Sequence, residues 1–268
     1  MIDRGKHNVL GIMVDAVDYE AAAGKILAAA TDRRPFAASA LAVHGVMTGV
    51  QDPEHGYRLN RLDLVVPDGQ PVRWALNLLH RTGLADRVYG PTLMAKVCAA
   101  AARDDIPIYL YGSERGVLDR LEASLTERYP GLTIAGAEPS KFRRTSAEEK
   151  AEIARRIRES GAGLAFVGLG CPRQEIFAYE YRELLEMPVV AVGAAFEYHA
   201  GLKREPHPAL QRAGLQWLHR LIQEPGRLWK RYTIVSATYV WLVALQVMRM
   251  RRMDPAAFPP PSTDVLHG

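Results

Sequence analysis

The stretch LAFVGLGCPRQE, residues 164–175, decides how the chain is interpreted. It opens with a short apolar run, Leu164 to Val167, which is bounded by glycines and is typical of a strand buried on both faces of a sheet. Gly168 and Gly170 then permit a sharp turn and a close backbone approach to a ligand, because neither carries a Cβ atom. The stretch therefore predicts a buried strand, a tight turn and a helix that faces a binding site.

The start of that helix is predicted to bind phosphate. Pro172 suits a first helical position, and the N–H groups of Arg173 and Gln174 would then point out of the positive end of the helix. A glycine-rich turn of this kind also fits α/β proteins that bind nothing there. Arg173 stands where the third glycine of G-x-G-x-x-G would be, so the dinucleotide fingerprint is absent, and the chain has no G-x-x-x-x-G-K-[ST] loop.

The composition is that of a globular protein, with 268 residues, 48% hydrophobic residues and a net charge of +4. Two cysteines far apart in sequence, Cys98 and Cys171, indicate neither a disulfide framework nor a zinc site, and they suit a reducing compartment. The first residues lack the pattern of a signal peptide, so we expect a cytoplasmic protein. We expect no nucleic acid among its partners, and homo-oligomers stay an open possibility.

Apolar runs alternate with helical patterns, which predicts an α/β fold. The expected strands are Val9 to Val14, Ala38 to Val43, Leu62 to Val66, Pro107 to Tyr111, Leu132 to Ala135, Leu164 to Val167 and Pro188 to Ala195. The expected helices are Asp18 to Ala30, one beginning near Pro71, Pro91 to Arg103, one capped by Ser113 and one opened by the capping box at Ser146. The fold class is Rossmann-like, a mainly parallel sheet with helices on both faces.

Three regions are expected along the chain. Residues 1–203 form the α/β domain, residues 204–253 a basic, aromatic helical appendage, and residues 254–268 a disordered, proline-rich tail.

Four loops follow expected strands and are predicted to share one crevice, since ligands of such sheets bind beyond the carboxyl ends of the strands. They are residues 67–70, 111–113, 168–174 and 193–197. Asp68 offers an exposed carboxylate in the first loop, although an aspartate that caps the following helix fits the local pattern as well.

Each further candidate has a plain structural alternative. The candidate ligand contacts are His44, Gly69, Gln70, Arg73, Arg87, Gly112, Ser113, Gly168, Gly170, Arg173, Gln174 and Glu197. The arginines also fit solvated surface groups, His44 a packed histidine, and Gln174 and Glu197 ordinary surface positions. Cys171 has no histidine near it in sequence, which favours a small structural thiol over a nucleophile. We expect neither a metal nor another cofactor, because the chain has no H-E-x-x-H, EF-hand loop or D-x-D pair.

The last third of the chain has a different character. Cationic Arg220, Arg227, Lys230 and Arg231 alternate with tryptophans and leucines, and they would attract phosphates or anionic lipid heads. The apolar segment Thr233 to Met248 falls short of a membrane span, so we interpret it as an amphipathic helix in the interface. A true span and a helix packed on protein are the alternatives.

With these segments in hand, the chain resembles the WecG/TagA/CpsF family of bacterial glycosyltransferases over roughly residues 38 to 235. The resemblance rests on seven ordered blocks: LDLVVPDGQPV, DRVYGPTLM, IYLYGS, RYPGLTIAG, LAFVGLGCPRQE, VVAVGAAFEYHAGLKREP and GLQWLHRLIQEPGRLWKRY.

The resemblance implies transfer of a sugar from a nucleotide-sugar donor, with UDP favoured as the nucleotide, to a glycan on polyprenyl diphosphate. It further implies inversion at the anomeric carbon, no metal ion, a place on the inner face of the cell membrane, and a role in cell-surface or exopolysaccharide synthesis. By residue, it implies that Asp68 is the general base and that Arg87 and Gln174 are polar groups of the active site. It also implies that the basic residues at 220, 227 and 230 meet the lipid diphosphate.

One departure from the family pattern concerns the second expected strand. Many members carry T-x-N there, and the matching positions are Ala40 and Ala42, so His44 is a candidate replacement contact. The alternative function is a non-catalytic nucleotide-binding scaffold at the membrane, which would bind nucleotide without transferring sugar. A nicotinamide-dependent oxidoreductase is disfavoured by the missing third glycine.

Overall fold

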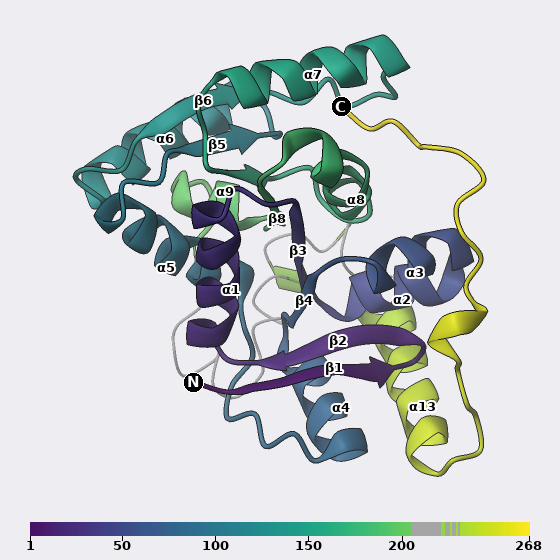
Figure 1. Cartoon of the computed structure of the whole chain (residues 1–268). Helices are drawn as coiled ribbons and strands as arrows, with labels where there is room; N and C mark the ends of the chain where they lie inside the picture. Colours follow the sequence, from purple (N-terminus) through teal and green to yellow (C-terminus); the bar gives the residue numbers. More distant parts are fainter. Residues whose placement is uncertain (205–220, 223–225, 227–228, 230) are drawn as a thin grey trace.

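The computed structural model describes residues 1–204, 221–222, 226, 229 and 231–268, with the backbone alone for 231 and 232. The expected parallel sheet with helices on both faces is confirmed (Figure 1). Its six strands, in the order β4-β3-β8-β7-β5-β6, are β3 (Phe36–Leu41), β4 (Leu64–Pro67), β5 (Ile108–Tyr111), β6 (Ile134–Glu138), β7 (Leu164–Val167) and β8 (Pro188–Ala191). Every pairing in this sheet is parallel.

Both faces of the sheet are buried, and β7 shows how the sequence achieves this. Leu164 and Phe166 belong to one hydrophobic core, whereas Ala165 and Val167 belong to the other. Successive side chains of a strand point to opposite faces, so a continuous apolar run is what a doubly covered strand needs. The prediction of this strand was correct to the residue.

Two groups of helices supply the two cores. One face is covered by α1 (Tyr19–Thr31), α5 (Gly90–Arg103), α6 (Arg115–Arg128) and the short α9 (Ala195–His199). The other is covered by α2 (Val43–Gln51), α3 (Pro53–Asn60), α4 (Gln70–His80), α7 (Ala147–Glu159), α8 (Arg173–Leu185) and α13 (Ser236–Val247). Local signals place some of these helices: Asp18 caps α1, and Ser146 with Glu149 forms the expected capping box of α7.

The first expected strand is in fact two. β1 (Asp3–Val9) and β2 (Ile12–Val17) form an antiparallel hairpin, and its turn residues Leu10 and Gly11 both have positive φ. The Asn8 side chain accepts a hydrogen bond from the Gly11 N–H at 2.6 Å and closes the turn. The run VLGIMV has no polar break, so the hydrophobic pattern concealed a turn that Gly11 marks.

Three more boundaries differ from expectation. Strand β3 ends at Leu41, two residues earlier than expected, and α2 and α3 follow it, which puts His44 on a helix. Helix α6 is capped by Glu114, because Ser113 adopts a left-handed conformation with φ of 63°. The last strand ends at Ala191, four residues earlier than expected, and α9 follows it.

Helix α13 packs on the domain by one face. Tyr239 is buried and donates a hydrogen bond to the Pro71 carbonyl at 3.2 Å, and Gln246 bonds the backbone of Asn8 and Leu10 in the hairpin. One π-helical turn, η1 (Arg231–Val235), precedes it. Among the described residues, no helix has both the length and the apolar character that crossing a membrane demands.

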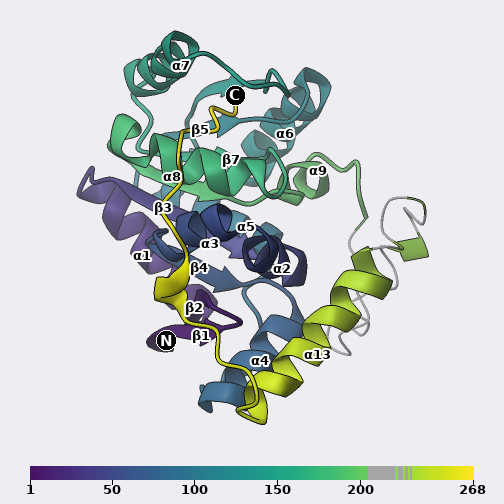
Figure 2. The same ribbon diagram turned by 90° about the vertical axis from the view of Figure 1, so that its right-hand side faces the viewer.

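The proline-rich tail, which we expected to be disordered, is an extended segment that crosses the molecule (Figure 2). After the short 3-10 helix η2 (Pro255–Ala257) it runs past α3 and α8 to α7. The buried carboxylate of Glu180 accepts the N–H groups of Val265 and Leu266 at 2.7 and 3.1 Å, and Lys150 pairs with Asp264 at 2.8 Å. The composition of the tail did not predict this extended, bound conformation, because the groups that hold the tail lie on α7 and α8, far away in sequence.

Replacing Glu180 by alanine should release the tail, because two backbone N–H groups lose their acceptor. We expect amide hydrogen exchange at residues 263–267 to accelerate by roughly tenfold or more, in line with loss of about 1.5–3 kcal/mol of charge-assisted hydrogen bonding. The control is Glu183→Ala, which removes an exposed carboxylate from the same helix. Unchanged exchange in the tail of the Glu180→Ala protein would show that this carboxylate does not hold it.

Candidate active site

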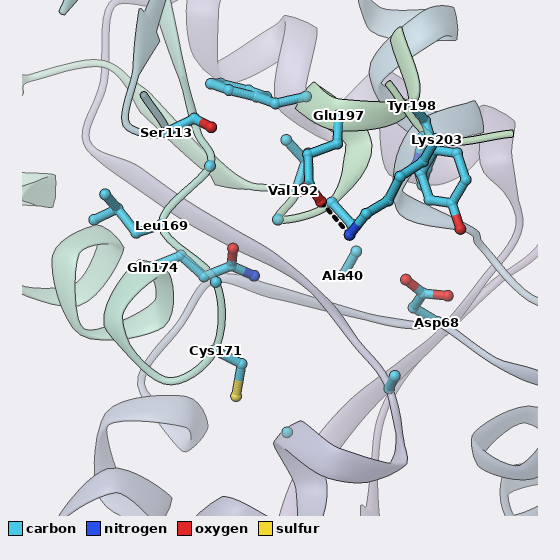
Figure 3. A pocket seen from close by; sticks show the side chains of 18 of the residues that line it. Ala40, Asp68, Ser113, Leu169, Cys171, Gln174, Val192, Glu197, Tyr198 and Lys203 are labelled. Carbon is cyan, nitrogen blue, oxygen red and sulfur yellow. Dashed lines mark ion pairs between the residues drawn. The ribbon is translucent and has the colours of Figure 1, made fainter. Parts of the chain in front are cut away.

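A cavity of about 430 Å³ opens at the carboxyl edge of the sheet (Figure 3). Residues that follow β3, β4, β5, β7 and β8 all contribute to its lining. The expected crevice is therefore present, and Asp68, Ser113, Gly168, Gly170, Gln174 and Glu197 from the predicted set line it.

Asp68 forms one wall. It directly follows β4, it is half-buried, and its backbone N–H donates to the Leu41 carbonyl at 3.1 Å. Its Oδ2 atom lies 3.4 Å from the N–H of Gly90, the first residue of α5. The cap residue of α4 is Gly69, one position after Asp68. The carboxylate of Asp68 therefore lies beside the positive end of α5, where a negative group is favourably placed.

The turn after β7 forms the opposite wall. Pro172 is the cap residue and α8 begins at Arg173, one residue later than expected. The backbone N–H of Gln174 donates to the Gly170 carbonyl at 3.1 Å, so our expectation that it faces a ligand was wrong. The side chain of Gln174 does line the cavity, and its amide nitrogen donates to Glu175 at 2.9 Å.

Two glycines bring neighbouring loops into contact behind this wall. A Cβ atom on Gly112 would lie 2.8 Å from the Leu169 side chain and 3.1 Å from the backbone of Gly168. Gly112, expected to contact substrate, is not among the lining residues, and its role is this close approach. A Cβ atom on Gly168 would in turn lie 2.6 Å from the Phe196 ring.

Lys203 is a cation of the cavity that sequence reasoning missed. Its Nζ atom pairs with the Glu197 carboxylate at 2.6 Å, and Figure 3 shows both side chains at the cavity, with Asp68 on the same side. The Lys203 backbone N–H also donates to the Glu197 carbonyl at 3.2 Å. The available signal was its place in the block VVAVGAAFEYHAGLKREP, six residues after Glu197.

Arg87 lies behind the cavity, not in its lining. It is buried, and its guanidinium stands 4.5 Å from the ring centroid of Tyr89, which does line the cavity. The Tyr89 N–H donates to the Tyr19 hydroxyl at 3.0 Å. Arg87 is therefore placed to support Tyr89.

Five more predicted residues lie outside the lining: His44, Gly69, Gln70, Arg73 and Arg173. Arg73 donates to the Leu84 and Ala85 carbonyls at 3.0 and 2.8 Å, and Gln70 donates to Asp86 at 2.9 Å, so both hold the loop after α4. The guanidinium of Arg173 stands 6.0 Å from the ring centroid of Phe142, a lining residue.

Ala40 and Ala42 both line the cavity on the side of Asp68. The resemblance stated from the sequence matches these positions to a threonine and an asparagine of many family members, and here both side chains are methyl groups. His44 is not a lining residue, so it does not replace the threonine and asparagine contacts in the cavity.

Two buried polar residues near Cys171 also escaped prediction. Glu175 is 1% exposed, and burial raises the pKa of its carboxyl, against hydrogen bonds from Gln174 and Ser39 that lower it. Burial likewise lowers the pKa of His55, on α3, to about 4. His55 gave no signal because α3 itself was not predicted.

The structure does not describe the side chains of the cationic residues predicted to contact lipid. Arg220, Arg227 and Lys230 lie outside the described residues, and for Arg231 only the backbone is described, within η1.

Comparison of the sequence with known proteins identifies the family of the chain. Residues 7–253 match the model of the glycosyl transferase WecG/TagA/CpsF family, and the chain belongs to this family of glycosyltransferases. The resemblance stated from the sequence is thereby confirmed.

Two curated relatives share the name N-acetylglucosaminyldiphosphoundecaprenol N-acetyl-beta-D-mannosaminyltransferase. The protein of Bacillus subtilis (strain 168) is 27% identical over 217 residues, covering 80% of each chain. The protein of Bacillus spizizenii (strain ATCC 23059 / NRRL B-14472 / W23) is 29% identical over 184 residues, covering 68% of each chain.

Proposed function

We propose that the cavity transfers a sugar from a nucleotide-sugar donor, UDP-linked, to a glycan carried on polyprenyl diphosphate, in cell-surface or exopolysaccharide synthesis. The transfer inverts the anomeric carbon and needs no Mg²⁺ or Mn²⁺ ion on the donor diphosphate. The observation that carries the proposal is that Asp68 lines the same cavity as Gln174 and Lys203. The printed name of both relatives supports the lipid-linked acceptor.

Asp68 acts as the general base in this mechanism. Its carboxylate accepts the proton of the acceptor hydroxyl while that oxygen attacks the anomeric carbon, on the face opposite the departing nucleotide. The hydrogen bond from Gly90 and the N-terminus of α5 orient the carboxylate. Proton transfer to a positioned base contributes about 10²–10⁴-fold in rate.

The donor diphosphate lies near Lys203 and the turn at residues 168–170. Lys203 supplies the positive charge, and its ion pair with Glu197 holds the side chain at the cavity before donor binds. The charge that develops on the leaving diphosphate is then stabilised by a group already in place. Gln174 contributes its side-chain amide from the opposite wall.

The variant Asp68→Asn should lose turnover by about 10²–10⁴-fold while donor binding stays nearly intact, because asparagine keeps the shape but cannot accept the proton. The measurement is the rate of sugar transfer alongside donor affinity by calorimetry. Asp119→Asn, at an exposed position on α6, is the matched control. Turnover at the parental rate would mean that Asp68 is not the base.

The variant Lys203→Ala should raise the KM for donor by about 10- to 100-fold, as expected when a charge-assisted contact to phosphate is lost. The KM for the lipid acceptor should change much less, so a two-substrate kinetic analysis separates the roles. Lys96→Ala, which removes an exposed lysine paired with Glu20, serves as the control. Equal KM changes for both substrates would contradict a donor-binding role.

We propose that the exposed face of α13 lies on the inner surface of the cell membrane. Val240 and Trp241 are 61% and 62% exposed on this helix, while Tyr239 anchors its other face to the domain. This arrangement combines two interpretations made from the sequence, an interfacial helix and a helix packed on protein. The cations at 220, 227, 230 and 231 would add attraction to lipid phosphate.

Replacing Trp241 by alanine should weaken binding to vesicles that contain anionic lipid by roughly tenfold, because a large apolar side chain no longer leaves water. Cosedimentation with vesicles measures this. The control is Leu184→Ala, which removes an exposed leucine from α8. If both variants cosediment like the parent, α13 is not the contact.

The reaction itself is tested with a panel of UDP- and GDP-linked sugars against polyprenyl-diphosphate glycans, with products identified by mass spectrometry. Binding of nucleotide without transfer from any donor would favour the scaffold alternative.

A further inference from the structure

Three side chains with metal-binding atoms converge beside the cavity. His55 comes from α3, Cys171 from the turn after β7, and Glu175 from the first turn of α8. Each offers one ligand atom, and these atoms all lie within 4.8 Å of one another. The packing of α3 against α8 brings together residues that are more than a hundred positions apart in sequence.

Three polar atoms of His55 and Glu175 are buried and lack hydrogen-bond partners among the described residues. The His55 side chain is completely buried, and neither of its ring nitrogens bonds to any residue in the described part of the chain. One carboxylate oxygen of Glu175 accepts bonds from Ser39 and Gln174, whereas no nitrogen or oxygen donor of the described residues reaches the other. Burying polar atoms in this way is costly, so their convergence on one point needs an explanation.

We propose that His55, Cys171 and Glu175 bind one divalent transition-metal ion of the zinc type. Imidazole, thiolate and carboxylate are all common zinc ligands, and three protein ligands leave a fourth position to water or a ligand atom. A thiolate in the set disfavours Mg²⁺ and Ca²⁺, which prefer oxygen ligands. The Cys171 side chain is hydrogen-bonded to Glu175. When Cys171 binds the metal ion, its thiol releases its proton to solvent.

This ion is distinct from the Mg²⁺ or Mn²⁺ that sugar-nucleotide chemistry often uses on a diphosphate. Its ligands contact the cavity only through Cys171 and Glu175, because His55 is not a lining residue. The ion would fasten α3 to the start of α8 beneath the wall that Gln174 forms. The proposal stands whether or not the transfer reaction is the one described above.

Cobalt titration of the full chain tests the site directly. The purified protein is stripped with a chelator, desalted and titrated with Co²⁺. We expect a thiolate-to-cobalt charge-transfer band in the near ultraviolet that saturates at about one equivalent and is removed by Zn²⁺ but not by excess Mg²⁺. Absence of this band in the parent protein would overturn the proposal without recourse to any variant.

Variants then assign the ligands. Cys171→Ser should abolish the band, and His55→Gln and Glu175→Gln should each weaken cobalt binding by tenfold or more. The matched control is Cys98→Ala, since Cys98 is the other cysteine of the chain and is buried in the core on the opposite face of the sheet. A band that survives Cys171→Ser, or that Cys98→Ala removes, would contradict the assignment.

Thermal unfolding gives a second readout. Zinc at 100 times its dissociation constant should raise the Tm of the parent and of Cys98→Ala by roughly 5 °C, because ligand bound only to the folded state stabilises it. The Tm of Cys171→Ser should not respond. An equal rise in all three proteins would indicate zinc binding elsewhere and count against the site.

Discussion

The structure depends on one constraint, the burial of short parallel strands on both faces. The four-residue strands β7 and β8 contain only apolar side chains, and every residue in them is buried. Function is therefore confined to the loops at their carboxyl ends, where the chain leaves the apolar layers. Several polar groups of the cavity lie at such positions: a carboxylate after β4, an amide and a thiol after β7, and a lysine beyond β8.

The sequence predicted the sheet well because its signals are local. Continuous apolar runs gave the strands, and cap residues such as Asp18 and Ser146 gave the helix starts. Predictions failed where the deciding contact is distant. The hairpin turn at Gly11 lies within an apolar run, and the tail is held by Glu180 and Lys150, which no analysis of residues 254–268 alone can reveal.

The candidate site was predictable in outline but not in its charges. The place of Asp68 opposite the turn after β7 followed from parallel-sheet geometry. Which cations face the cavity did not follow, because the sequence cannot distinguish an arginine that binds ligand from one that holds a loop. Arg73 bonds backbone carbonyls and Arg87 stacks on Tyr89, whereas Lys203 reaches the cavity. His55 shows the same limit, since only the packing of α3 on α8 places it near Glu175.

The contact between Gly112 and Gly168 has a consequence for how the family can vary. The two backbones approach so closely that a methyl group on Gly112 would meet the other loop, while one on Gly168 would meet Phe196. A substitution at either glycine must therefore be accompanied by others, because a new side chain there requires the neighbouring residues to move or to become smaller. Homologues that carry larger residues there are expected to show compensating changes at both loops.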